Sequence, residues 1–279
     1  MTIEKIKMIS KEISKKTNIP FNKIFHNYFL ELILRKISKS KYSNFFVLKG
    51  GYLITTIFNY KWRTTVDLDF MSIFKNKNLG EIKDIVNKIL NEKDENDTIY
   101  KIYKTEPINV NNEKKGIRLY VKVKIKNITE IVPLDIVEES KIDPTYISKE
   151  FNSIYGENFT FLIYNIENVI AEKVFAIYTN RFWNSRLKDF FDIYYLFENQ
   201  KKFINKEILK KAIDNAFKVR NASFDKTIFI DLLNALKISE LQNLQWEKLV
   251  LSKNWQTSKS FGEIVEVIIK HFENDIENV

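Results

Sequence analysis

The sequence predicts an α+β fold, with a mixed sheet flanked by helices in its first part and mainly helices in its second part. Short apolar segments alternate with helical patterns before about residue 140, and one segment, 117–125, alternates apolar and polar residues with period two. Helical periodicity dominates from Glu167 onward. We therefore expect two domains, residues 1–145 with the sheet and residues 146–279 with most of the helices.

The elements of the first part follow from apolar periodicity and from glycine and proline positions. In 117–125, Val121 and Val123 should face a core while Lys122 and Lys124 face solvent. The polar segment 91–97 is expected to be a loop. The expected helices are 3–16, 20–38, 52–58 and 80–90, and the expected strands are 45–48, 66–73, 99–103, 117–125 and 131–137.

The second part contains amphipathic patterns that predict a series of helices. Ser260 and Glu263 have the spacing of a capping box, which predicts a helix start at this point. The expected helices are 167–180, 186–198, 206–218, 226–237 and 261–272.

The composition excludes several kinds of site. Without cysteine, the chain of 279 residues forms no disulfide and no thiolate metal site, and with only His26 and His271 a zinc site or a Ser-His-Asp triad is not expected. The net charge of +9 favours an anionic partner such as tRNA, another RNA or an acidic protein, although the lysine-rich composition alone also explains it. Neither a signal peptide nor an apolar membrane span is evident, so we expect a cytoplasmic protein.

A glycine pair, Gly50-Gly51, joins an apolar strand to a helix start. Glycines let backbone N–H groups approach a phosphate, and a helix N-terminus favours negative charge. A tight turn between strand and helix also needs glycine, so this motif alone leaves phosphate binding open.

Two acids, Asp67 and Asp69, lie one residue apart in the next strand, so their side chains should point to the same side. Val66, Leu68 and Phe70 should then point into the core. Paired carboxylates beside a glycine turn can hold a metal–nucleotide complex, although a solvated edge strand would show the same D-x-D pattern.

A third acid, Asp135, interrupts the apolar run 131–137. A buried carboxylate is costly unless it is paired or bound to a metal. Asp135 could complete a carboxylate triad or act as a base toward an attacking hydroxyl. A bend or edge position after Pro133 is the alternative.

Two later helices supply further candidates. Lys173 falls inside the apolar stripe of 167–180, so it needs an anionic partner or extends from the stripe edge to solvent. In the helix 186–198, Lys188, Asp189 and Asp192 are expected to face a cleft, although an ordinary i,i+4 ion pair is the alternative.

Together, these motifs resemble the AbiEii/AbiGii (MenT-like) toxin family of bacterial abortive-infection and toxin–antitoxin systems. The order is F-V-L-K-G-G, R-x-T-x-D-L-D-F, A-E-K and R-L-K-D-F-F-D-I-Y. The resemblance implies a DNA polymerase β-like nucleotidyltransferase core, with a helical C-terminal domain that completes the active-site cleft. It implies nucleotide transfer from an NTP, with Mg²⁺ or Mn²⁺, to an acceptor, most often the tRNA 3′ end, which causes growth arrest. A cognate antitoxin would act by binding, by modification or indirectly.

The candidate site residues follow from the motifs and the resemblance. A glycine at position 51, where many nucleotidyltransferases have serine, is taken as a trait of the family. Catalytic roles are expected for Asp67, Asp69, Asp135, Lys188 and Asp192, nucleotide binding for Lys49, Gly50, Gly51, Thr65, Lys173 and Asp189, and metal binding for Asp67, Asp69 and Asp135.

Two other functions stay open at this point. The same glycine turn and acids could serve a nucleotidyltransferase that modifies a protein or a small molecule such as an antibiotic. The chain could also be a non-catalytic protein that binds RNA or a partner through a degenerate site.

Overall fold

The chain forms two compact units, which the computed structural model describes over residues 1–57, 65–93, 98–110, 113–138, 146–183, 186–253 and 257–275. The first unit consists of Met1–Glu139 and Tyr146–Ile163, and the second of Ser140–Thr145 and Tyr164–Val279. The expected division at residues 145 and 146 thus differs from the observed units, because residues 146–163 add strands to the sheet of the first unit.

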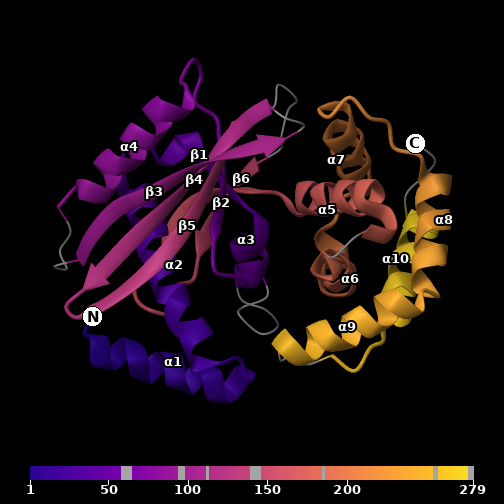
Figure 1. Ribbon diagram of the computed structural model, residues 1–279, viewed down its shortest axis with the longest axis horizontal. Coiled ribbons are helices and arrows are strands. Elements are labelled where there is room, and N and C mark those ends of the chain that lie inside the picture. The colour runs from indigo at the N-terminus through magenta and orange to yellow at the C-terminus, as the bar shows by residue number, and fades with distance from the viewer. Residues whose placement is uncertain are drawn as a thin grey trace. The chain divides into compact units, whose positions relative to one another are not determined.

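A mixed sheet is the centre of the first unit, with strand order β3-β4-β5-β2-β1-β7-β6 (Figure 1). β1 pairs with β2 in antiparallel orientation, whereas the pairs β1–β7 and β2–β5 are parallel. The mixed sheet that the sequence predicts is therefore confirmed. Its strands are β1 (Phe46–Lys49), β2 (Leu68–Ser72), β3 (Thr98–Val110), β4 (Glu113–Ile125), β5 (Ile128–Glu138), β6 (Tyr146–Phe151) and β7 (Phe159–Tyr164).

The helices of this unit are α1 (Ile3–Thr17), α2 (Phe21–Lys39), α3 (Gly50–Ile57) and α4 (Leu79–Asn91). α2 and α4 contact each other and one face of the sheet (Figure 1). As the alternation predicts, Val121 and Val123 are fully buried, while Lys122 and Lys124 are exposed on the opposite side of β4. The sheet therefore has one face under helices and, along β4, one face open to solvent.

Three strands are longer than the sequence predicts, and two were missed. β3 and β4 pair over almost their whole length. Outward lysines and a β-bulge at Tyr103 interrupt the apolar alternation, so the sequence pattern predicts shorter strands. β6 is exposed at most of its residues, so its sequence carries little apolar signal. Of the loop expected at 91–97, residues 94–97 lie outside the described residues.

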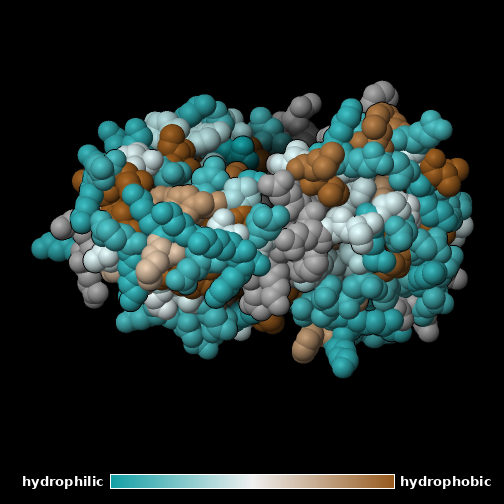
Figure 2. All heavy atoms as spheres, turned by 90° about the horizontal axis from the view of Figure 1, so that it is seen from below, coloured by the Kyte–Doolittle hydropathy of each residue, from teal (hydrophilic) through white to brown (hydrophobic). Residues whose placement is uncertain are grey.

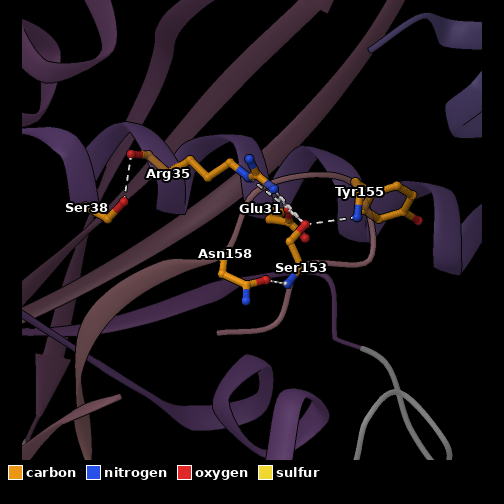
Figure 3. Close-up of polar contacts among 6 residues, drawn as sticks. All are labelled: Glu31, Arg35, Ser38, Ser153, Tyr155 and Asn158. Atoms are coloured by element: carbon orange, nitrogen blue, oxygen red, sulfur yellow. Dashed lines mark hydrogen bonds and ion pairs between the residues drawn. The ribbon is translucent and has the colours of Figure 1, made fainter. Parts of the chain in front are cut away.

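Hydrogen bonds join an ion pair within α2, Glu31 with Arg35, to the segment between β6 and β7 (Figure 3). Arg35 donates from Nε and Nη2 to Glu31 Oε1, at 2.8 and 2.6 Å, and from Nη2 to Ser153 Oγ at 2.6 Å. The Ser153 hydroxyl in turn donates to Glu31, and its oxygen accepts the Tyr155 N–H. A Cβ at Gly156 would lie 3.1 Å from Arg35 Nη2, so glycine makes room for the guanidinium. This network holds the β6–β7 connection against α2.

The second unit is helical in its described part, as the sequence predicts (Figure 1). Its helices are α5 (Ile166–Asn180), α6 (Leu187–Gln200), α7 (Lys206–Lys218), α8 (Lys226–Lys237), α9 (Glu240–Lys253) and α10 (Phe261–Asp275). The capping box is confirmed, because Ser260 Oγ accepts the Glu263 N–H and Glu263 Oε2 accepts the Ser260 N–H. The sequence missed α9, where Leu241, Leu244 and Leu251 are exposed and leave no single apolar stripe.

The surface drawn in Figure 2 is mostly hydrophilic, with hydrophobic residues in separate patches. None of the helices in the described ranges combines the length and the apolar character that a membrane span needs.

We expect Arg35→Met to lower the free energy of unfolding by about 3–5 kcal/mol, because Glu31 would remain buried without its cation. Burial already raises the pKa of Glu31 above its ordinary value, against the opposing effects of Ser153 and Arg35. A raised carboxyl pKa favours the folded state at low pH, so the variant should regain stability as the pH falls. Chemical denaturation at pH 8 and pH 5 measures both effects.

The matched control is the double variant Glu31→Gln/Arg35→Met, which removes the buried charge together with its partner. It should lose less stability than Arg35→Met alone. Equal losses in the two variants would contradict the account of an uncompensated carboxylate.

Candidate active site

The glycine turn at the end of β1 forms a seat for the carboxylate of Asp69. Gly50 has a φ of +67°, and a Cβ at this position would lie only 1.9 Å from Asp69 Oδ2. The Gly51 N–H points to the same oxygen at 3.4 Å. Only glycine satisfies both the left-handed backbone and the close carboxylate. The turn therefore places Asp69 at the N-terminus of α3.

A row of charged residues crosses the sheet at this point. Lys49 pairs with Asp69, Asp69 with Asp135, and Asp135 with Arg118, in the registers of four adjacent strands. Directly paired residues of neighbouring strands lie on the same face. The pKa of Asp69 is raised, first by burial and then by the charge of Asp67, with Asp135 adding to the effect and Lys49 opposing it. The charges of Asp67 and Asp135 thus both act on Asp69. A carboxylate triad of the three acids stays a prediction.

Asp67 precedes β2, and its carboxylate is held by the residue two positions before it. The Thr65 hydroxyl donates to Asp67 Oδ1 at 2.5 Å. Val66 is 61% exposed, so the expectation that it points into the core is wrong. The reason is that β2 begins only at Leu68, so strand alternation does not extend to Val66. His26 of α2 contacts the carbonyl oxygen of Val66 through Nε2 at 3.0 Å.

Asp135 makes a bidentate ion pair with Arg118. Arg118 Nε and Nη2 each donate to one oxygen of Asp135, both at 2.6 Å. Arg118 was not among the predicted site residues, although the period-two pattern of β4 places it on the same face as Lys122. Its partner could not be named, because the register between β4 and β5 is not visible in a single sequence.

The chemistry of Asp67 and Asp69 fits a divalent cation that comes with a triphosphate. Within the described ranges, no group of three or more His, Asp or Glu side chains is placed to share one metal ion. Mg²⁺, however, is commonly held by one or two carboxylates, with substrate phosphates among its other ligands. Asp67 and Asp69 offer such hard oxygen ligands. Burial, followed by the charge of Asp67, raises the pKa of Asp69, and a cation would offset that charge repulsion. Asp135 as a third ligand stays a prediction.

In the second unit, Lys173 of α5 binds two carboxylates of α6. Its ammonium lies 2.7 Å from Asp189 Oδ1 and 2.7 Å from Asp192 Oδ2. Both aspartates are fully buried, and Arg186 Nε lies 3.0 Å from the second oxygen of Asp189. The predicted anionic partner of Lys173 is therefore a pair of carboxylates, and the alternative of a lysine that extends to solvent is wrong.

Lys188 differs from its neighbours on α6 because its side chain is exposed. The expectation that Lys188, Asp189 and Asp192 face one cleft is wrong, since the two aspartates turn toward Lys173 and are fully buried. Catalytic roles for Lys188 and Asp192, and nucleotide binding by Lys173 and Asp189, stay predictions.

The candidate residues thus form two groups, one in each unit. The first unit brings together Lys49, Gly50, Gly51, Thr65, Asp67, Asp69 and Asp135, and the second brings together Lys173, Asp189 and Asp192. That both groups meet around one triphosphate stays a prediction.

A glycine turn beside two aspartates, on a mixed sheet followed by a helical region, fits the class of nucleotidyltransferases. The chain matches the family described as nucleotidyl transferase AbiEii toxin, of type IV toxin–antitoxin systems, over residues 32–266. This chain belongs to that family. The resemblance that the motifs indicate, and the expected fold of the family, are therefore confirmed.

The solved structures similar to this chain include two crystal structures from Helicobacter pylori. JHP933 is 18% identical, with coverage of 91% of this chain and 95% of that chain and a TM-score of 0.47. A candidate nucleotidyltransferase is also 18% identical, with coverage of 90% and 96% and a TM-score of 0.45. No curated protein sequence matches the chain significantly.

We expect Gly50→Ala to lower the free energy of unfolding by at least about 2 kcal/mol, because alanine strains the positive φ and its Cβ collides with the Asp69 carboxylate. The control is Gly262→Ala in the first turn of α10, where the nearest atom to a new Cβ is 3.4 Å away. That variant should be as stable as the wild type or slightly more stable. Thermal unfolding of both variants is the measurement. A Gly50→Ala protein as stable as the wild type would contradict the close contact between Gly50 and the Asp69 carboxylate.

A second pair of variants separates the roles of the two lysines. Lys173→Met should lower the free energy of unfolding by about 3–5 kcal/mol, since it leaves Asp189 and Asp192 buried without their shared ammonium. Lys188→Met removes an exposed charge and should change it by no more than about 0.5 kcal/mol. Urea denaturation decides the comparison, and a Lys173→Met protein as stable as the wild type would refute a structural role for this ion pair.

Proposed function

We propose that this protein transfers a nucleotide from a nucleoside triphosphate to the 3′ end of a tRNA, and that the modification arrests growth. Membership of the AbiEii family supports the reaction class and the role as the toxin of a toxin–antitoxin pair. The observation that carries the proposal is the seat of Asp69 on the Gly50-Gly51 turn, in register with Asp135 and close enough to Asp67 for their charges to interact.

In this proposal, Asp67 and Asp69 hold Mg²⁺ or Mn²⁺ together with the triphosphate. When bound, the ion offsets negative charge on the phosphate oxygens. The Thr65 hydroxyl orients Asp67, and the glycine turn with the start of α3 lets backbone N–H groups approach the phosphates. Lys49, beside Asp69 in the row, adds a positive charge for the same phosphates.

The transfer itself forms one bond and breaks another. The acceptor hydroxyl oxygen bonds to the α-phosphorus while the bond from that phosphorus to the pyrophosphate oxygen breaks, and the hydroxyl proton passes to a base. Asp135 is the proposed base, and Arg118 fixes the direction of its carboxylate. Lys188 would contact the triphosphate, and Asp192, through Lys173, would help to place α6 against α5.

The proposal also names the partners of the protein. A cognate antitoxin follows from the family, and its mechanism stays open among binding, modification and indirect repression. The net charge of +9 favours RNA over a small neutral acceptor. Because NTPs and tRNA are its substrates in this proposal, the protein would act in the cytoplasm. As the family resemblance implies, its growth arrest would defend cells against phage by abortive infection.

The test is transfer of label from each of the four NTPs to total tRNA in the presence of Mg²⁺. Asp67→Ala and Asp69→Ala should each reduce transfer by more than about 100-fold, because the bound metal supplies several kcal/mol of charge stabilisation. Asp84→Ala, on the exposed side of α4, is the matched control and should leave transfer unchanged.

Protein and aminoglycoside acceptors are tested in parallel. Label on one of these instead of tRNA would favour the alternative of a protein- or antibiotic-modifying enzyme. Absence of transfer to every acceptor, with equal behaviour of wild type and Asp69→Ala, would sink the proposal.

A further inference from the structure

The outer face of β3 and β4 carries a group of exposed lysines, one exposed tyrosine and one half-buried tyrosine, which we call the hairpin face. It consists of Lys101, Tyr103, Lys104, Tyr120, Lys122 and Lys124. α2 covers the opposite face of these strands. Tyr100 of β3 lies on that face, and the Lys36 ammonium of α2 lies 5.0 Å above its ring. Among the described residues, the hairpin face is thus open to solvent for most of its side chains.

Aromatic rings and ammonium groups alternate on the hairpin face. The rings of Tyr103 and Tyr120 lie 6.1 Å apart, and Tyr103 is 45% exposed. Lys104 lies 5.2 Å above the ring of Tyr120, and Lys122 lies 5.3 Å above the ring of Tyr103. The β-bulge between Ile102 and Lys104 places Tyr103 and Lys104 side by side in β3, both of them exposed.

The charges of the hairpin face are poorly balanced within the protein. Lys104 pairs with Glu106 at 2.5 Å. Lys101 and Lys122, in contrast, are directly paired in the register of β3 and β4, and like charges in this position repel each other. Such a pair does not help the fold, but a bound polyanion would turn the repulsion into a favourable interaction.

The hairpin face is continuous with the candidate active site. Arg118, which holds Asp135, pairs with Glu106 in the register of β4 and β3, and Glu106 accepts hydrogen bonds from Lys104 and Tyr120. Since adjacent strands are about 4.8 Å apart, β3 lies roughly 15 Å from Asp69 across the sheet. An extended chain on the hairpin face can therefore place its end at the acids of β2.

We propose that the hairpin face binds the single-stranded end of a nucleic-acid acceptor. Bases stack on Tyr103 and Tyr120, and the lysines contact the phosphates, as in proteins that bind single strands through aromatic and cationic side chains. This inference rests on the proposed function for the reaction, but the binding itself does not depend on catalysis. An acidic antitoxin protein is the competing occupant and is an outcome of the test.

The first experiment measures binding of a 5′-labelled single-stranded RNA of about 12 nucleotides by fluorescence anisotropy at several salt concentrations. Lys101→Gln/Lys122→Gln should weaken binding and reduce the salt slope by about 1.4, since each phosphate contact on a single strand contributes about 0.7. The matched control is Lys7→Gln/Lys11→Gln, which removes two exposed charges from α1 and should leave the slope unchanged.

Tyr103→Ala should weaken binding roughly 10-fold by the loss of base stacking, whereas Tyr103→Phe should retain it. Circular dichroism melting verifies that each variant is folded. If both lysine pairs weaken RNA binding equally, or if Tyr103→Ala binds like the wild type, the assignment of the hairpin face is wrong.

The second experiment follows label transfer to tRNA. The hairpin variants should raise the KM for tRNA about 10-fold or more while the kcat stays nearly unchanged, because the face binds the acceptor away from the reacting atoms. If the wild type transfers label and the variants keep its KM for tRNA, the assignment of acceptor binding to the hairpin face is wrong, while the proposed function still holds.

Two further outcomes separate the alternatives. RNA binding that depends on the hairpin face without any transfer by the wild type would overturn the proposed function alone. Loss of affinity for the purified antitoxin, with RNA binding unchanged, would assign the face to a protein partner and contradict this inference.

Discussion

The first unit depends on the contact between the Asp69 carboxylate and the backbone of Gly50 and Gly51. The register of β1, β2 and β5 places Lys49 and Asp135 beside Asp69. The contact with the glycines holds the Asp69 carboxylate where burial and neighbouring acids raise its pKa. The fold thus carries a local cost that a bound cation would reduce, which is a common compromise between stability and a prepared ionic site.

Local signals in the sequence predicted much of the fold and of the candidate site. Apolar periodicity predicted α7 and α8 to the residue, and the alternation of β4 predicted which face carries its lysines. The spacing of Asp67 and Asp69 was sufficient to predict that their charges interact. These features depend on neighbours along the chain, so a single sequence contains them.

Features that depend on distant partners were not predictable in this way. The ion pair of Arg118 with Asp135 requires the register between two strands, and the exposure of Val66 depends on where β2 begins. The sequence indicated that Lys173 needs an anion, but only the packing of α5 on α6 shows that Asp189 and Asp192 supply it. A buried lysine shared by two carboxylates restricts how these helices can pack, because a shift would separate the charges.

The connection from β1 to α3 leaves no spare residue. Lys49 is the last residue of the strand and Gly50 the first of the helix, while β1 lies between β2 and β7 in the sheet. One residue inserted here would either push β1 out of register with both neighbours or rotate α3 by about 100°. Related sequences should consequently keep a constant chain length across this junction.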